Sequence, residues 1–223
     1  MNILDKKEKI QSIINVFETG SLKGDYKNIS IYNDGPNGAK QVTYGKSQTT
    51  EYGNLKDLIK MYVENKGLVA ERLQPYISKI GIIPLYNNKA FTNLLKEAGT
   101  DPIMISTQDV FFDKHYWTPA MKWCQDNKFT FPLAGLVIYD SYIHSGSILP
   151  FLRKRFVAKT PANGGDQQEW ITQYLITRKE WLRTHTNIIL RKTVYRVNNM
   201  ITAVEKKDWM LESPFNANGL LVP

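Results

Sequence analysis

The sequence predicts a mainly α-helical protein of the α+β class, with a small β element in the first third of the chain. Several segments place apolar residues three and four positions apart and close on a glycine, as amphipathic helices do. One early segment, rich in Gly, Pro and Asn, alternates apolar and polar residues instead. The 223 residues, 42% of them apolar, suffice for one sizeable core, so we expect a single domain over residues 1–223 without a separate linker.

The first predicted helix covers residues 5–17, and Gly20 follows it as a stop signal. Its apolar face is formed by Ile10, Ile13, Ile14 and Phe17. The alternating segment at residues 29–45 predicts two short strands, or extended arms, joined by a turn that contains Asp34.

Further helices are predicted after this turn. The runs at residues 54–67 and 87–99 have helical spacing. Asp101 followed by Pro102 marks another helix start, because the carboxylate can cap free amides and proline fits the first turn. The run at 131–146 is apolar nearly all round, as expected for a central buried helix. Two more helices are expected at residues 170–183 and 188–201, before a tail with little periodicity.

Composition narrows the possible classes of protein. No run of 18 apolar residues occurs, so we expect no membrane span, and the opening MNILDKKEKI lacks the basic-then-apolar plan of a secretory signal. The net charge of +8 would attract polyanions. The basic residues are scattered, however, and runs such as DKKEK and VEKKD carry their own acids, so we interpret them as solvated helix faces and expect no nucleic-acid partner.

The sequence shows no signature of a metal or cofactor site. Cys124 is the only cysteine, which excludes an intramolecular disulfide and a cysteine-based metal site. His115, His144 and His185 share no metal-ligand spacing, and none accompanies an obvious Ser or Cys nucleophile. No phosphate loop or dinucleotide fingerprint occurs. We therefore expect neither a metal nor a cofactor.

Two carboxylates near the N-terminus are candidates for acid and base chemistry. Glu18 lies four residues after Ile14, so it continues the apolar stripe of the first helix in its last turn. Partial burial and the negative end of the helix dipole both favour a protonated carboxyl group there, as a general acid requires. The alternative, that Glu18 ends the helix and faces water, stays open. Asp34 precedes Gly-Pro-Asn-Gly, which is also ordinary turn chemistry.

A third unusual carboxylate, Asp140, lies within the apolar run LAGLVIYDSYI. A charge on a helix buried on all sides must be paired. Arg178 and Arg196, on the two later helices, can supply that pair and extend toward Glu18. A structural ion network and support for catalysis are compatible interpretations.

Taken together, these segments resemble family 46 of the glycoside hydrolases, the chitosanases. The opening FETG with a downstream DG resembles the region of that family's catalytic Glu and Asp, and PLAGLVIYDSYIHSG resembles its central helix. TPANGGDQQEWITQYLITRKEW and TVYRVNNM resemble its loop and its two arginine-bearing helices. Four ordered segments agree at comparable spacings along nearly the whole chain.

The resemblance implies a two-lobed, lysozyme-like fold with a substrate cleft between the lobes. It assigns Glu18 as the general acid and Asp34 as the general base. It makes Asp140, Arg178 and Arg196 the buried network that supports the acid.

The resemblance also implies substrate contacts. Thr43, in the strand after the turn, matches a threonine that helps hold the attacking water. Many relatives place an acidic residue near the start of the following helix to bind a substrate amine, where this chain has Asn54, with Glu51 three residues earlier. We expect Glu51, Asn54 and Asp57 to contact the substrate.

The expected function is endo-acting, inverting hydrolysis of a β-1,4-linked amino-sugar polymer, most readily chitosan, by a secreted, monomeric enzyme. Peptidoglycan is the alternative substrate, because the net positive charge and Asn54 suit a polycation poorly. A sugar-binding relative without turnover is the second alternative. Release of reducing ends by the wild type, lost on substitution of Glu18, distinguishes an enzyme from a binder.

Overall fold

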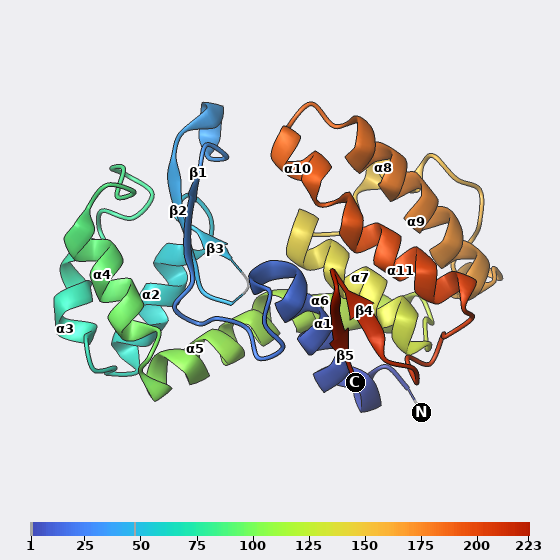
Figure 1. Ribbon diagram of the computed structural model, residues 1–223, viewed down its shortest axis with the longest axis horizontal. Coiled ribbons are helices and arrows are strands. Elements are labelled where there is room, and N and C mark those ends of the chain that lie inside the picture. Colours follow the sequence, from blue (N-terminus) through green and yellow to red (C-terminus); the bar gives the residue numbers. More distant parts are fainter. Residues whose placement is uncertain (1, 47) are drawn as a thin grey trace. The chain divides into compact units, whose positions relative to one another are not determined.

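The computed structural model describes residues 2–46 and 48–223, and most of them are helical (Figure 1). The chain divides into two compact units. Unit 1 joins Met1–Leu22 to Lys114–Pro223, and unit 2 is Lys23–Asp113. The mainly helical class with a small β element in the first third of the chain is confirmed.

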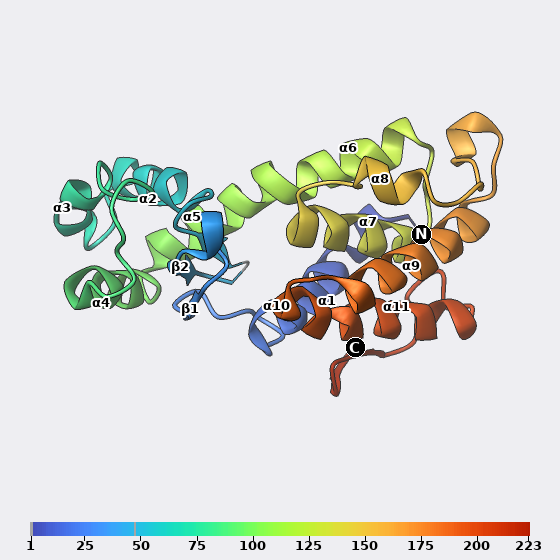
Figure 2. The same ribbon diagram turned by 90° about the horizontal axis from the view of Figure 1, so that it is seen from above.

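Unit 1 is built around α7 (Pro132–Ser145), the predicted central helix, whose residues from Pro132 to Ser141 are all buried. It contacts α1, α6, α9 and α11 (Figures 1 and 2). Neighbours on every side explain why the helix is apolar all round. The helices of this unit are α1 (Lys7–Thr19), α6 (Thr118–Asp126), α7, α8 (Pro150–Arg153), α9 (Gln167–Thr184), α10 (Ile188–Lys192) and α11 (Val194–Glu205).

The end of α1 is fixed by the glycine that the sequence singles out. Gly20 adopts a left-handed conformation with φ of 70°, and its N–H donates to the carbonyl oxygen of Val16 at 2.9 Å. This closes the helix in the way that C-terminal glycines commonly do. Glu18 therefore lies in the last turn, as expected, next to the buried Phe17.

In the C-terminal part of unit 1, one prediction is wrong and one element was not predicted. The expected helix at 188–201 is two helices, α10 and α11, with Thr193 between them. The tail contains an antiparallel hairpin of β4 (Phe215–Ala217) and β5 (Leu220–Val222), which contacts α1. Its turn is Asn218–Gly219, both with positive φ, and Asn-Gly is the strongest short hairpin signal in a sequence. The strands are too short for their alternation to be detected.

Unit 2 combines a three-stranded antiparallel sheet with helices. The sheet has the order β1 (Ile29–Tyr32), β2 (Gln41–Tyr44), β3 (Thr49–Thr50), and Ser30 lies opposite Thr43 in its register. The predicted pair of strands around the Asp34 turn is thus present. The helices are α2 (Leu55–Glu64), α3 (Ala70–Leu73), α4 (Lys89–Ala98) and α5 (Pro102–Phe112).

The start of α5 shows why Asp101 precedes Pro102. The Asp101 carboxylate accepts a hydrogen bond from the N–H of Ile103 at 2.9 Å, which caps the helix as predicted. Its other oxygen accepts from Tyr62 Oη and from the N–H of Leu68, both at 2.7 Å. One carboxylate therefore links α5 to α2 and to the segment that follows α2.

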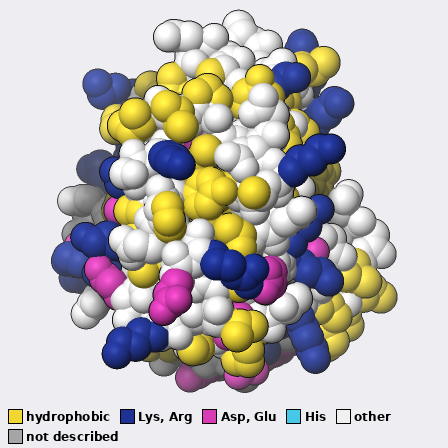
Figure 3. All heavy atoms as spheres, turned by 90° about the vertical axis from the view of Figure 1, so that its left-hand side faces the viewer, with side chains coloured by type: hydrophobic (Ala, Val, Ile, Leu, Met, Phe, Trp, Pro, Cys, Tyr) yellow, Lys and Arg dark blue, Asp and Glu magenta, His cyan; other side chains and the backbone are white. Residues whose placement is uncertain are grey.

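Charge is dispersed over the one face of the molecule that Figure 3 shows. On the face shown in Figure 3, Lys and Arg side chains lie scattered among apolar and neutral ones instead of forming one basic patch. Within the described part of the chain, no helix is both long and apolar enough to cross a membrane.

Candidate active site

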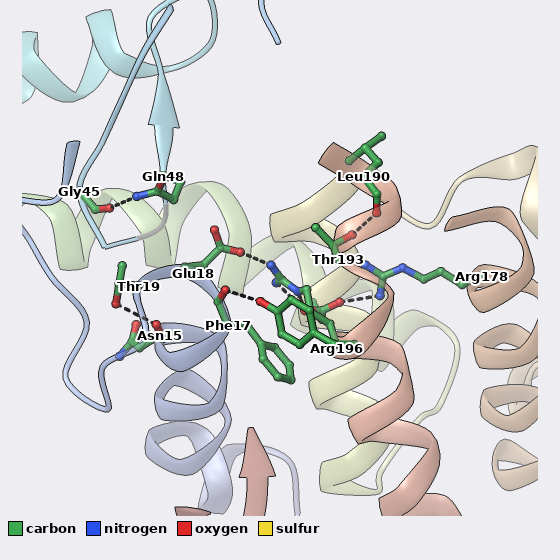
Figure 4. A network of polar contacts seen from close by, with 12 residues as sticks. Asn15, Phe17, Glu18, Thr19, Gly45, Gln48, Arg178, Leu190, Thr193 and Arg196 are labelled. Atoms are coloured by element: carbon green, nitrogen blue, oxygen red, sulfur yellow. Dashed lines mark hydrogen bonds and ion pairs between the residues drawn. The ribbon is translucent and has the colours of Figure 1, made fainter. Parts of the chain in front are cut away.

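Glu18, the expected acid, lies against a buried arginine. Its side chain is 11% exposed, and its Oε1 accepts a hydrogen bond and ion pair from Nη1 of Arg196 (Figure 4). Arg196 comes from α11, so α1 and α11 meet at this contact. The alternative in which Glu18 only ends its helix and faces water does not fit these contacts.

Asp140 binds both arginines that the sequence offered as partners. Its Oδ1 accepts from Nε and Nη2 of Arg196 at 2.9 and 2.6 Å, and its Oδ2 accepts from Nη1 of Arg178 at 2.6 Å. Asp140 is fully buried, and Arg178 and Arg196 are nearly so. The expected pairing of this buried charge is thus present, and it links α7, α9 and α11.

The arginines determine the ionisation of Asp140. Burial alone would raise its pKa, but the positive charges of Arg196 and Arg178 outweigh burial and lower the pKa to about 2. For Arg196, burial acts to lower the pKa, while Asp140 and Glu18 raise it above its ordinary value. Both groups stay charged at neutral pH, and Arg196 is held between two carboxylates.

Aromatic contacts fix the end of α1 against α11. Tyr195 donates a hydrogen bond from its hydroxyl to the carbonyl oxygen of Phe17 at 2.8 Å, and the two rings meet edge to face. The guanidinium of Arg196 lies 5.2 Å from the centre of the Phe17 ring. Neighbouring residues on each helix therefore hold Glu18 and Arg196 together.

His144, one turn after Asp140 on α7, stays neutral in this surrounding. Burial, followed by the charges of Arg196 and Arg178, lowers its pKa to about 3. In the described residues its two ring nitrogens have no hydrogen-bond partner. His144 is therefore a packed, neutral side chain beside the Asp140 network.

Asp34, the expected base, lies in unit 2 in the exposed loop between β1 and β2. Its Oδ1 accepts a hydrogen bond from Nε2 of Gln41 at 2.9 Å. Gln41 is buried at the start of β2, and its Oε1 accepts from the N–H of Tyr52 at 3.2 Å. Gln41 could not be identified from the sequence, because a glutamine in a polar turn segment carries no signal of burial.

Thr43, the expected water ligand, is buried in β2, two residues after Gln41. Its hydroxyl has no hydrogen-bond partner within the described residues. A buried hydroxyl without a protein partner is suited to bind an ordered water.

Of the three expected substrate contacts, Glu51 takes a different role. Its Oε2 accepts from the N–H of Val42 at 3.0 Å and its Oε1 from the N–H of Leu85 at 2.8 Å. The side chain is 1% exposed, so both oxygens hold backbone within unit 2 and neither faces a substrate. The expectation that Glu51 contacts a substrate amine is corrected accordingly. Asn54 precedes α2, and Asp57 is exposed in its first turn.

These residues lie within one family match. The model of glycosyl hydrolase family 46 matches residues 12–215. This chain belongs to glycosyl hydrolase family 46. All nine residues that the sequence assigned to the site fall inside the match, and the suspected family and its enzyme class are confirmed.

Relatives of this family 46 enzyme are distant in sequence and close in fold. A chitosanase of Bacillus subtilis (strain 168) is 22% identical over 231 residues, which cover 95% of this chain and 81% of that protein. A mutant chitosanase from Bacillus subtilis MY002, complexed with 6 GlcN, has 21% identity and a TM-score of 0.86, with 98% of each chain covered. The GH46 chitosanase of Gynuella sunshinyii, in complex with chitotetraose, has 20% identity and a TM-score of 0.84, covering 98% of this chain and 97% of that one. The two structures show that the fold is shared.

In the described part of this family 46 chain, no group of three or more His, Cys, Asp or Glu side chains is placed to hold a metal ion. At this site the structure brings together the carboxylates of Glu18 and Asp140 and the guanidinium groups of Arg178 and Arg196.

Proposed function

We propose that this family 46 enzyme is an endo-acting chitosanase that hydrolyses β-1,4 linkages between glucosamine units with inversion at the anomeric carbon. The observation that carries the proposal is Glu18, mostly shielded from solvent and bound to Arg196, which Asp140 holds in turn. Two relatives of the same fold have structures with 6 GlcN or chitotetraose bound, which supports this substrate class.

In the proposed mechanism, Glu18 donates its proton to the glycosidic oxygen as the bond from that oxygen to the anomeric carbon breaks. Asp34 takes a proton from water as the water oxygen bonds to the same carbon from the opposite face. The net change is the addition of one water. Glu18 is left as a carboxylate and Asp34 as an acid, and solvent returns the proton from Asp34 to Glu18.

Arg196 stabilises the charge that this step leaves on Glu18. Once the proton has moved, the carboxylate faces a fixed, buried guanidinium, which requires no reorganisation at the moment of reaction. Asp140 and Arg178 hold the guanidinium in place. We assign Arg196, Asp140 and Arg178 as positioning residues for the acid.

Thr43 is proposed to help hold the attacking water that Asp34 activates. Asn54 and Asp57, both at the start of α2, are the remaining candidates to contact a substrate amine, and the exposed carboxylate of Asp57 has the charge that an ammonium group prefers. Glu51 is excluded from this set by its buried contacts. Action as a monomer outside the cell fits this substrate and is part of the same proposal.

Chitosan and purified peptidoglycan sacculi, incubated in parallel with the wild type and with Glu18→Gln, test the proposal. We expect the wild type to release short glucosamine oligomers from well-deacetylated chitosan, identified by mass spectrometry, and Glu18→Gln to release them at least about 10²-fold more slowly. The anomeric configuration of the first product, followed by NMR, should be opposite to that of the β-linked substrate. Release of muropeptides without chitosan oligomers would identify peptidoglycan as the substrate and leave the proposed roles of Glu18 and Asp34 unchanged. Binding of either polymer without any product would indicate a sugar-binding relative without turnover.

A further inference from the structure

The loop that carries Asp34 is held by an amide side chain that the mechanism above does not use. Gln41 spans two partners. Its Nε2 donates to Oδ1 of Asp34 at 2.9 Å, and its Oε1 accepts from the N–H of Tyr52 at 3.2 Å. The side chain is 4% exposed although Asp34 is itself exposed. A buried side chain therefore donates a hydrogen bond to a carboxylate at the surface.

Close packing holds the same loop at its next residue. Gly35 donates its N–H to the carbonyl oxygen of Ala39 at 2.9 Å. A Cβ on Gly35 would lie 2.8 Å from that oxygen and 2.9 Å from Cδ2 of the Tyr52 ring, so only glycine fits. The backbone at Gly35, next to Asp34, thus packs closely against Tyr52, whose N–H donates to Gln41. Only the rotation of the carboxylate is then left for Gln41 to set.

We propose that Gln41 is a positioning residue for Asp34: its amide N–H holds Oδ1 and turns Oδ2 toward the attacking water. The inference rests on the proposed role of Asp34 as general base. A neutral donor is suited to this task, because it fixes the carboxylate without neutralising the charge that the base needs. Oδ2 is the atom left to accept the proton, since the described contacts of Asp34 involve Oδ1.

A second glutamine in the same unit gives a matched control. Gln108, on α5, is also buried and also uses both ends of its amide, accepting from the N–H of Lys46 at 3.1 Å and donating to the carbonyl oxygen of Tyr26 at 2.8 Å. It makes no hydrogen bond to Asp34 or Glu18. Substituting either glutamine disturbs a buried amide, but only Gln41 binds the proposed base.

The experiment compares Gln41→Glu with Gln108→Glu. At position 41 the new side chain keeps an acceptor for the N–H of Tyr52 and loses the donor to Asp34. We expect kcat on chitosan to fall by about 10- to 100-fold at the wild-type optimum, with KM within about twofold, because small misplacement of a reacting group costs rate and not binding. Gln108→Glu should lower the melting temperature at least as much and keep kcat within about threefold.

The pH profile separates positioning from loss of stability. As the pH falls, the carboxyl group introduced in Gln41→Glu takes up a proton, and its O–H can again donate to Asp34. The optimum of Gln41→Glu should therefore move toward acid, while that of Gln108→Glu stays with the wild type. Equal losses of kcat in the two variants, or an unmoved optimum for Gln41→Glu, would overturn the proposal.

Two further variants cover the remaining outcomes. Should Gln41→Glu fail to fold, Gln41→Met fills the same space without charge or hydrogen bonds, and full kcat in it also overturns the proposal. Asp34→Asn tests the base itself. An active Asp34→Asn would refute the role of Asp34, whereas an inactive Asp34→Asn beside a fully active Gln41→Glu would refute only the role of Gln41.

Discussion

The surroundings of Glu18 and of Asp34 position their carboxylates by opposite means. Glu18 is positioned by charged groups: Arg196, Asp140 and Arg178 are buried, and each is paired. Asp34 is positioned by neutral groups: the amide of Gln41 donates a hydrogen bond to it, and the adjacent Gly35 packs closely against the Tyr52 ring. Glu18 must lose a proton to a leaving group and then be stabilised as an anion, which a fixed cation achieves. Asp34 must keep the basicity to take a proton from water, which a neighbouring cation would reduce.

The largest expected effect is on the acid. Glu18→Gln should lower kcat by about 10²- to 10⁴-fold, the usual contribution of general acid catalysis, since the amide has no proton to give. The fold should persist, because an amide oxygen can still accept from Arg196. Reducing-end release and circular dichroism check the two parts of this expectation. A folded Glu18→Gln protein with wild-type rates would remove Glu18 from the mechanism.

Removal of the Asp140 carboxylate, which binds Arg196 and Arg178, should have the largest effect on stability. Asp140→Asn should lower the free energy of unfolding at pH 7 by about 3–5 kcal/mol, because it leaves buried arginines without their shared anion. Urea unfolding measures this change. Glu205→Gln, an exposed change on the same helix as Arg196, is the control and should stay within about 0.5 kcal/mol. Equal midpoints for the two variants would contradict a stabilising role for the network.

Acid should weaken the same network. The pKa of Asp140 is about 2 in the folded protein and ~3.9 in an unfolded chain, so the unfolded state takes up the proton first as the pH falls. The stabilisation is therefore complete above about pH 5 and is lost as the pH approaches 2. Unfolding curves of the wild type and Asp140→Asn should converge over this range. A constant gap between them down to pH 2 would assign the difference to packing instead of charge.

A smaller effect is expected from Glu51, whose carboxylate holds two backbone N–H groups in unit 2. Glu51→Gln turns one acceptor into a donor that faces an N–H, which should cost about 1–3 kcal/mol of stability. KM for chitosan should stay within about twofold, because the side chain does not reach the surface. A raised KM in a protein of unchanged melting temperature would restore the amine contact that the sequence suggested.

The same contrast explains what the sequence could predict. A buried carboxylate in LAGLVIYDSYI demands a cation, so Asp140 and its two arginines could be inferred from the residues alone. The stripe that places Glu18 is likewise readable from helical period. Gln41 could not be found, because a neutral polar residue in a turn-rich segment is compatible with both burial and exposure. The role of Glu51 could not be predicted for a related reason: its partners are backbone N–H groups at Val42 and Leu85, and sequence spacing does not reveal the second of them.

The smallest expected effect concerns substrate choice. Asn54 precedes α2, where family resemblance led us to expect an acid, and Asp57 already lies in the first turn of that helix. Asn54→Asp adds a negative charge at a helix N-terminus, which is favourable by about 0.3–1 kcal/mol, so the variant should be no less stable than the wild type. If the substrate is the polycation chitosan, a second carboxylate beside Asp57 should lower KM a few-fold at low salt. This gain should shrink as the ionic strength rises and the screening length falls to ~8 Å. Neutral oligosaccharides of the same length should show no such gain, which makes N-acetylated oligomers the matched control. A KM for chitosan that stays unchanged at every salt concentration would place the start of α2 outside the amine-binding surface.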